Sequence, residues 1–200
     1  VYAEGEDPRV LRAAQMLVDD RIARPLLIGR RAAIEARVRE LGLRLDLGGG
    51  VPVLDPAEDA AIFDPLATEY QRLVGRRGAP PDAATRRLRN RTTVAAAMLL
   101  HAGHADAAIC GGSGDWWRHM LYVLPIIAKR PEVSRIYALT SLILPRGAIF
   151  ICDTHMNIDP TAEQVAEMTV LAAEAIRRFG IVPKAALLSH SSFGASNSPS

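Results

Sequence analysis

The chain has 200 residues, a formal net charge of +2 and 49% hydrophobic residues, which is enough to bury a substantial core. Its Lys and Arg residues are spread along the sequence, with only four Phe and four Tyr, so it lacks the clustered basic and aromatic surface typical of nucleic-acid binding. No apolar run approaches the roughly 18 residues of a membrane span, and no signal peptide opens the chain. These features predict a cytoplasmic protein with neither a nucleic-acid nor a membrane partner.

The two cysteines and the two chain ends carry further information. Cys110 and Cys152 each end an apolar run, which favours free thiols in a reducing compartment, with burial as small hydrophobic side chains as the ordinary reading. The chain starts at Val1 without a methionine and stops in a serine-rich loop at Ser200. We therefore expect an excerpt of a longer polypeptide.

Strand and helix patterns alternate over the first part of the chain. Short apolar runs predict strands at residues 1–5, 25–29, 51–54 and 105–110. Asp7 and Pro8 are typical of an N-cap and a first helical residue. Further helices are predicted over residues 32–41, 60–75, 81–102 and 116–129, the last with a kink at Pro125. This alternation predicts a mainly parallel sheet flanked by helices.

The pattern changes after Pro131. Two β-rich runs, 136–144 and 148–152, are separated by Pro145-Arg146-Gly147, which is a hairpin signal. A helix over 160–179, capped by Asp159, and a strand over 185–189 follow. We therefore predict a first α/β lobe over residues 1–131 and the start of a second over 132–200, truncated at its C-terminus.

The glycine-rich run Gly111-Gly112-Ser113-Gly114 lies between a predicted strand and a predicted helix. Exposed backbone N–H groups and the helix dipole at such a turn can hold a phosphate or a thioester oxygen. As a bare motif it also fits a simple connection, because it lacks the full dinucleotide fingerprint. Asp115 would cap the following helix and repel an incoming phosphate.

Arginines on the 81–102 helix are a second candidate for phosphate binding. Arg91, with Thr93 beside it, lies nearest the apolar end of this helix and is the arginine expected to point inward. Bidentate contacts to phosphate groups would suit such a side chain. A solvated helix face is the alternative meaning of the same arginine series.

The histidines predict no metal site. His101 and His104 are three apart, but Gly103 ends the helix between them and no carboxylate or Cys completes a first shell. His155 and His190 follow predicted strand ends, yet no G-x-S-x-G motif accompanies them, so a Ser–His–Asp triad is not predicted. His190 stays a candidate for a ligand cleft.

Four segments together resemble the phosphotransacetylase family. They are A-E-G-x-D-x-R-V-L-x-A-A at the start of the chain, A-D-A-x-x-C-G before the glycine turn, D-T-x-x-N-x-x-P-T-A-E-x-x-A-E from Asp153, and L-L-S-H-S-x-F-G from Leu187. The first and last are most similar to the malic-enzyme members of that family. The resemblance runs over essentially the whole chain.

The resemblance implies an isopropylmalate-dehydrogenase-like three-layer αβα fold with a mainly parallel sheet and two lobes, the second incomplete here. It implies acetyl-CoA or CoA as the ligand, in a cleft between the lobes, and a homodimer or higher homo-oligomer. Pattern and resemblance together assign the ligand-binding residues Arg91, Thr93, Gly111, Gly112, Ser113, Gly114, Arg118, Asp153, Asn157, His190 and Ser191.

Two departures from the family separate ligand binding from catalysis. When the Cys110-Gly111 turn and Ile126-Ile127 are laid on the family pattern, Leu121 falls where the enzymes carry a cleft arginine, with Arg118 one turn away. The enzymes of the family also carry a Ser-Arg pair late in the fold, which is absent here because the chain ends first, and a Ser-Arg-Gly run beyond this point would favour an enzyme. The resemblance therefore implies a non-catalytic, acetyl-CoA-responsive domain of a malic enzyme whose NADP and divalent-metal sites lie in N-terminal domains not represented here. An active phosphate acetyltransferase is the alternative.

Overall fold

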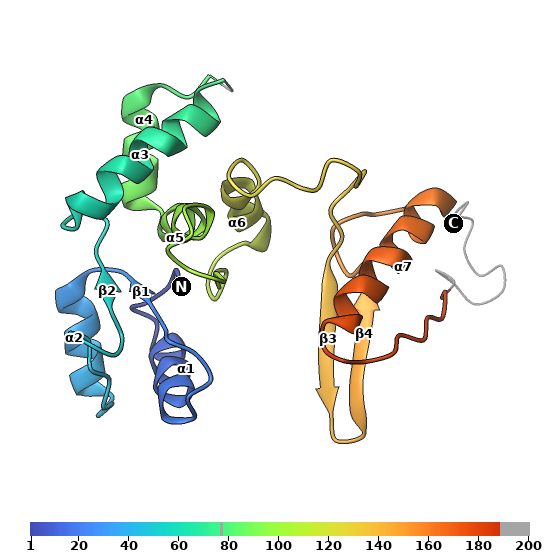
Figure 1. The fold of residues 1–200 in the computed structure, drawn as a ribbon, viewed down its shortest axis with the longest axis horizontal. Helices are drawn as coiled ribbons and strands as arrows, with labels where there is room; N and C mark the ends of the chain where they lie inside the picture. Colours follow the sequence, from blue (N-terminus) through green and yellow to red (C-terminus); the bar gives the residue numbers. More distant parts are fainter. Residues whose placement is uncertain (77, 189–200) are drawn as a thin grey trace. The chain divides into compact units, whose positions relative to one another are not determined.

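The computed structural model describes residues 1–76 and 78–188 of the chain (Figure 1). Two compact units are present, unit 1 over Val1–Ala128 and unit 2 from Lys129 onward. The division falls after Ala128, whereas the sequence pattern places the boundary after Pro131.

Unit 1 is built on a short parallel sheet. Strand β1 (Leu27–Ile28) pairs in parallel with β2 (Val53–Leu54), and Tyr2 bridges in parallel to both Leu27 and Ile109. The expected strands at 1–5 and 105–110 appear as single bridges, although further backbone hydrogen bonds join residues 1–5 to Leu26, Ile28 and Ile109. The mainly parallel α/β class predicted from the sequence is confirmed.

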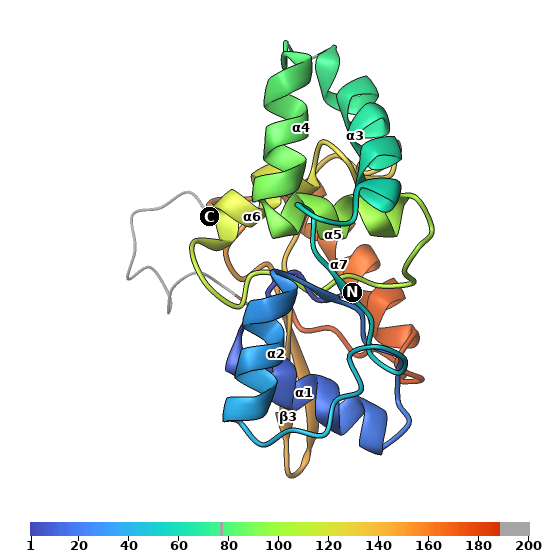
Figure 2. The same cartoon turned by 90° about the vertical axis from the view of Figure 1, so that its left-hand side faces the viewer.

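The helices of unit 1 are α1 (Pro8–Asp19), α2 (Arg31–Glu40), α3 (Ala60–Gly75), α4 (Pro81–Asn90), α5 (Thr92–His101) and α6 (Trp116–Val123). Asp7 caps α1 as predicted, its carboxylate accepting the Arg9 N–H at 2.7 Å. Figure 2 shows α3 and α4 side by side, in agreement with their contacts. One apolar cluster joins Phe63, Tyr70 and the residues of α5, and a second joins Leu11 to Ile34.

The prediction of one helix over 81–102 is wrong. The chain forms two helices there, α4 and α5, with Arg91 between them. Arg91 has the extended dihedrals φ −125° and ψ 98°. Helix α4 is amphipathic, whereas α5 buries every residue from Thr93 to Leu99. The break at Arg91 lets α5 change direction and enter the core. One straight helix would have to lie partly against solvent and partly within the core.

Helix α6 ends at Val123 instead of kinking at Pro125 and continuing to residue 129. Proline has no N–H to continue the helical hydrogen-bond ladder. The chain instead forms a turn in which the N–H groups of Ile126 and Ile127 both donate to the Val123 carbonyl, at 2.9 and 2.8 Å. The predicted kink is therefore a helix end.

Unit 2 contains the predicted hairpin. Strands β3 (Leu139–Leu144) and β4 (Gly147–Cys152) pair antiparallel, with Leu144 opposite Gly147 across the Pro145-Arg146 turn. Phe150, on one face, lies 5.6 Å from Phe179 between ring centroids. The opposite face carries Leu142, Leu144, Ile149 and Ile151, each between 41% and 51% exposed.

Helix α7 (Ala162–Arg177), which packs against β4, begins later than predicted. Thr161 is its N-cap and forms a capping box with Gln164, whereas Asp159 has φ 97° and lies outside the helix. The prediction of a strand over 185–189 is wrong for residues 185–188, which form no strand. Residue 189 lies outside the described residues. Within the described ranges, no helix is long and apolar enough to cross a bilayer.

Candidate functional site

The glycine turn, defined as residues 111–114, is held by side chains from distant parts of unit 1. The Gly111 N–H donates to the Glu4 carboxylate at 2.8 Å, and the Arg9 guanidinium donates to the Gly112 carbonyl at 2.7 Å. Arg9 is itself oriented by Asp7, at 2.7 Å. Gly111 and Gly114 have φ values of 89° and 88°, which favour glycine.

A histidine holds the third position of the turn. His119 Nε2 lies 2.8 Å from the Ser113 carbonyl oxygen, and His119 Nδ1 lies 2.8 Å from the Thr93 hydroxyl. Thr93 is 5% exposed and belongs to the buried run of α5. The glycine turn is thus linked through one ring to the core of unit 1.

The remaining amides of the glycine turn are available to a ligand. In the described part of the chain, the N–H groups of Gly112, Ser113 and Gly114 donate to no protein acceptor, and all three residues are exposed. Asp115 caps α6 instead, accepting the Trp117 N–H at 3.1 Å. Three successive unpartnered amides next to a helix start can bind an anionic oxygen.

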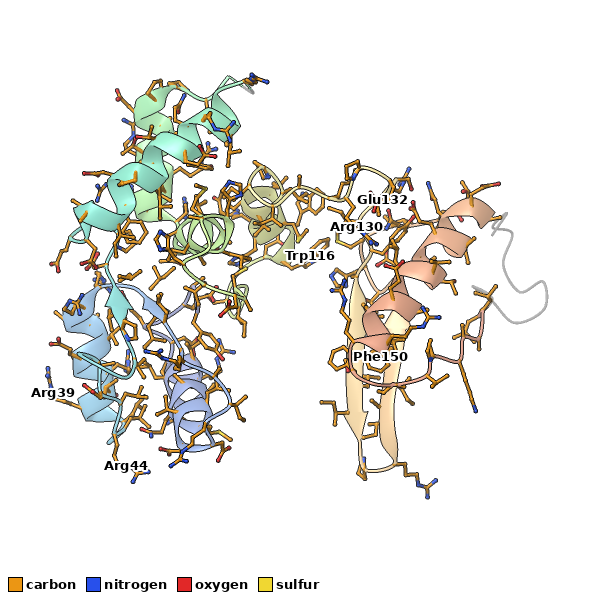
Figure 3. The ribbon with its side chains drawn as sticks, in the orientation of Figure 1. Arg39, Arg44, Trp116, Arg130, Glu132 and Phe150 are labelled. Carbon is orange, nitrogen blue, oxygen red and sulfur yellow. The ribbon has the colours of Figure 1, made fainter. Side chains whose placement is uncertain are left out.

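The arginines near this turn differ in their surroundings. The Arg91 guanidinium lies 5.9 Å from the centroid of the Tyr122 ring, a distance at which a cation is attracted to the ring face. Arg118 is exposed on α6. Leu121 is also exposed, at 51%, and Trp116, labelled in Figure 3, stacks edge to face on Trp117 with ring centroids 5.5 Å apart. Helix α6 therefore presents apolar side chains beside the turn.

Cys110, at the start of the turn, has no enhanced reactivity. Half-burial, and secondarily the Glu4 carboxylate, raises the pKa of its thiol. A raised pKa lowers the thiolate fraction, and the thiolate is the nucleophile. Cys110 is therefore a free thiol, as the sequence predicts, but it is half-buried instead of fully buried.

In unit 2, Asp153 organises the loop that follows β4. Its carboxylate accepts the N–H groups of Ala138, His155, Met156 and Asn157, at 2.8 to 3.3 Å, and the Asn157 side-chain amide at 2.6 Å. Burial alone would raise the pKa of Asp153, but these hydrogen bonds, led by the one from Asn157, lower it below its usual value. Asp153 thus fixes the loop as a carboxylate.

Asn157 continues this network. Its side-chain amide also donates to the Ile136 carbonyl at 2.9 Å, and its amide oxygen accepts from Arg135 at 3.4 Å. On α7, Glu167 accepts the Ser134 N–H and hydroxyl and the Tyr137 hydroxyl, and these bonds hold the pKa of Glu167 at about 2. Arg130, labelled with Glu132 in Figure 3, also pairs with Glu174 at 3.1 Å. The segment before β3 is therefore tied to α7.

The predicted site residues thus fall into three groups. Unit 1 brings Thr93 together with the glycine turn through His119, while Arg91 contacts Tyr122 and Arg118 is exposed. Unit 2 brings Asp153 and Asn157 together. The predicted residues His190 and Ser191 lie outside the described residues.

Sequence reasoning missed the three side chains that hold the glycine turn, Glu4, Arg9 and His119. Glu4 and Arg9 stand in the opening A-E-G-x-D-x-R segment that carries the family resemblance, and that was the available signal. His119 follows the turn by five residues and has no local motif. Within the two described ranges, no group of three or more His, Cys, Asp or Glu side chains is placed to hold a metal ion.

This parallel α/β unit with a glycine turn, followed by a hairpin and helix, has the architecture of phosphotransacetylases. It superposes on the EutD phosphotransacetylase from Staphylococcus aureus with a TM-score of 0.80 and 27% identity, covering 99% of this chain and 58% of that one. A phosphotransacetylase from Streptococcus pyogenes gives 0.81 and 29%, covering 99% and 59%. The predicted fold is confirmed.

The family described as phosphate acetyl/butaryl transferase matches residues 1–200, and the chain belongs to it. An NAD-dependent malic enzyme of Rhizobium meliloti is 48% identical over 200 residues, and an NADP-dependent malic enzyme of Escherichia coli is 44% identical over the same length. A phosphate acetyltransferase of Corynebacterium glutamicum is 31% identical over 193 residues, or 96% of this chain and 56% of that protein. The predicted resemblance is confirmed.

The alignment with each of these two malic enzymes includes the whole of this chain. It spans 26% of the length of each malic enzyme. It is homologous both to the phosphotransacetylase-like domain of malic enzymes and to phosphate acetyltransferases. Its higher identity is to the malic enzymes.

Proposed function

We propose that this chain is the acetyl-CoA-binding regulatory and oligomerisation domain of a malic enzyme, and that it transfers no acetyl group itself. The parent protein would oxidise and decarboxylate malate in other domains, which would also hold the nicotinamide coenzyme and a divalent metal. Relatives named for NAD and for NADP both match this chain, and we propose NADP as the coenzyme of the parent protein. We also propose a cytoplasmic homodimer or higher homo-oligomer.

The observation that carries this proposal is the placement of carboxylates around the glycine turn. Glu4 accepts the Gly111 N–H, and Asp115 accepts the Trp117 N–H. Both donors would otherwise be available to an acyl phosphate, and the carboxylates repel its charge. Leu121, an exposed alkyl side chain, also stands where the resemblance places an arginine.

These features weaken catalysis more than they weaken binding. A transferring acyl phosphate needs preorganised cations or N–H donors, and loss of one such donor typically lowers the rate by about 10²–10³. The unpartnered amides of Gly112, Ser113 and Gly114 support binding of the thioester oxygen of the ligand, which carries no formal charge and is not repelled by these carboxylates. A domain that binds acetyl-CoA without consuming it can shift the parent enzyme between two states of different affinity.

Two assays on the full-length natural protein test this function. Acetyl transfer from acetyl phosphate to CoA, followed by the loss of thiol, should stay at background, while acetyl-CoA should change the rate of malate oxidation. Gly112→Leu should weaken acetyl-CoA binding in calorimetry by crowding the free amides. Gly48→Leu is the matched control, since Gly48 is likewise exposed and its φ is not positive. Equal binding by both variants would move the site away from the turn.

The second candidate function is phosphate acetyltransfer. The phosphate acetyltransferase of Corynebacterium glutamicum, of which this chain covers more than half, favours it. Robust turnover of acetyl phosphate and CoA by the full-length protein would replace the regulatory proposal with this one.

A further inference from the structure

The hydrogen bonds to the glycine turn determine where its free amides point. Arg9 holds the Gly112 carbonyl and His119 lies against the Ser113 carbonyl. A peptide unit is planar and trans, so the N–H of the next residue points opposite to each carbonyl. The Ser113 N–H is therefore directed away from Arg9, and the Gly114 N–H away from His119.

The second of these amides depends on a buried hydroxyl. Because the Ser113 carbonyl can only accept, the Nε2 of His119 carries the proton. In the neutral ring Nδ1 is then the acceptor, and the Thr93 hydroxyl donates to it across 2.8 Å. Thr93 is 5% exposed, and its branched side chain has few rotamers within a helix. The core of unit 1 thus fixes the ring.

This link does not depend on the charge of the histidine. When the ring is protonated, Nδ1–H can donate to the Thr93 oxygen and Nε2–H still donates to Ser113. The Glu4 carboxylate on Gly111, the Arg9 guanidinium on Gly112, and Asp115 at the start of α6 are the charged groups held at this turn. Both ring states therefore keep the Ser113 carbonyl in place.

We propose that the Thr93–His119 pair is a positioning element that presents the Gly114 amide, and with it the glycine turn, to the thioester oxygen of the ligand. Neither side chain need touch the ligand. The inference rests on the proposed function, because it assumes that the acetyl-CoA ligand uses this turn. It adds two residues whose effect on affinity is indirect.

Calorimetric titration of the full-length natural protein with acetyl-CoA tests the pair. Thr93→Val keeps the shape of the side chain and removes the hydroxyl, so the dissociation constant should rise about tenfold, as loss of one orienting hydrogen bond implies. Thr93→Ser keeps a hydroxyl at this position and should bind acetyl-CoA with nearly the wild-type affinity. His119→Ala should weaken binding at least as much as Thr93→Val.

Thr92→Val is the matched control. Thr92 is half-buried, one residue away on the same helix, and its hydroxyl takes part in no hydrogen bond among the described residues. It should leave affinity and the melting temperature unchanged. Equal affinities for Thr93→Val and Thr92→Val would overturn the inference. Binding by Thr93→Ser as weak as that by Thr93→Val would overturn it as well.

Hydrogen exchange separates this inference from the proposed function. Thr93→Val should speed exchange in the peptide containing the glycine turn, and Thr92→Val should not, whether or not ligand is present. If the wild-type protein bound no acetyl-CoA, the proposed function and the ligand role of the pair would both fall. The exchange result would then show separately whether the pair still orders the turn.

Discussion

The glycine turn at residues 111–114 and the loop at residues 153–157 both follow a paired β segment, but they use their backbone amides in different ways. In the glycine turn, side chains from elsewhere in unit 1 hold one amide and two carbonyls, and three amides are left unpartnered among the described residues. In the second loop, Asp153 itself accepts the amides of residues 155, 156 and 157.

This difference in amide partners makes the glycine turn a candidate ligand site and the loop at 153–157 a structural element. A carboxylate that collects several N–H donors already occupies the position that an external anion would take. The loop at 153–157 is therefore self-contained, although the sequence assigns Asp153 and Asn157 to ligand binding. The glycine turn is held from behind and keeps its donors for a ligand, so it is the stronger candidate of the two.

The largest expected effect on stability comes from removing the carboxylate that holds the loop at 153–157. Asp153→Ala leaves five N–H groups without their acceptor and should lower the free energy of unfolding by about 2–3 kcal/mol. Asp153→Asn retains one acceptor oxygen and should lose less. Urea unfolding of the full-length protein, with hydrogen exchange at residues 155–157, measures both. A loss under about 1 kcal/mol for Asp153→Ala would show that the loop does not depend on its own carboxylate.

A smaller effect should distinguish two glycines of the turn. Gly114 has φ 88°, so Gly114→Ala should lower stability by about 1–2 kcal/mol. Gly112 lacks a positive φ, and an added Cβ would meet no atom closer than 3.9 Å, so Gly112→Ala should change stability by less than about 0.5 kcal/mol. Thermal unfolding compares the two variants. Equal losses would contradict the turn geometry.

The smallest expected effect concerns the support of Arg9. Asp7→Ala removes the N-cap of α1 and the partner of Arg9, and should cost about 1 kcal/mol at pH 7. The Arg9 side chain and the Arg9 amide hold the pKa of Asp7 at about 2, below its ordinary 3.8. A depressed carboxylate pKa stabilises the fold above the unfolded pKa, so this contribution is lost as pH falls from about 4 toward 2.

Urea unfolding at pH 7 and at about pH 2 measures that dependence. The wild-type protein and Asp7→Ala should differ at pH 7 and converge in acid. Asp20→Ala is the control, because Asp20 is exposed at the C-terminal end of α1 and does not cap the N-terminus. A difference that persisted unchanged in acid would show that the Asp7 charge is not responsible.

Much of the fold was predictable because its signals are local. Helix α3 spans Ala60–Gly75, as its apolar pattern predicts, and the Pro145-Arg146-Gly147 turn predicts the observed hairpin. The break at Arg91 was not predictable, since Asn90-Arg91-Thr92 contains neither Gly nor Pro. It arises because α5 turns into the core, a tertiary effect that propensity does not record.

The candidate site was predictable in part for a related reason. The glycines of the turn are a local signal, and the resemblance supplied the opening segment. Their support is long-range, since Glu4 and Gly111 are 107 positions apart and Arg9 and Gly112 are 103 apart. A single sequence contains no pattern that pairs such positions, so the side chains holding the turn emerged only from the structure.

The hairpin of unit 2 has a consequence for handling the chain in solution. Its face with Leu142, Leu144, Ile149 and Ile151 is aliphatic and substantially exposed, and Arg146 at the tip is the one charged residue from Leu139 to Cys152. Strand edges without charges readily pair with other chains. We expect the 200-residue chain to self-associate through this hairpin as its concentration rises, and to precipitate early in sulfate, which strengthens apolar association.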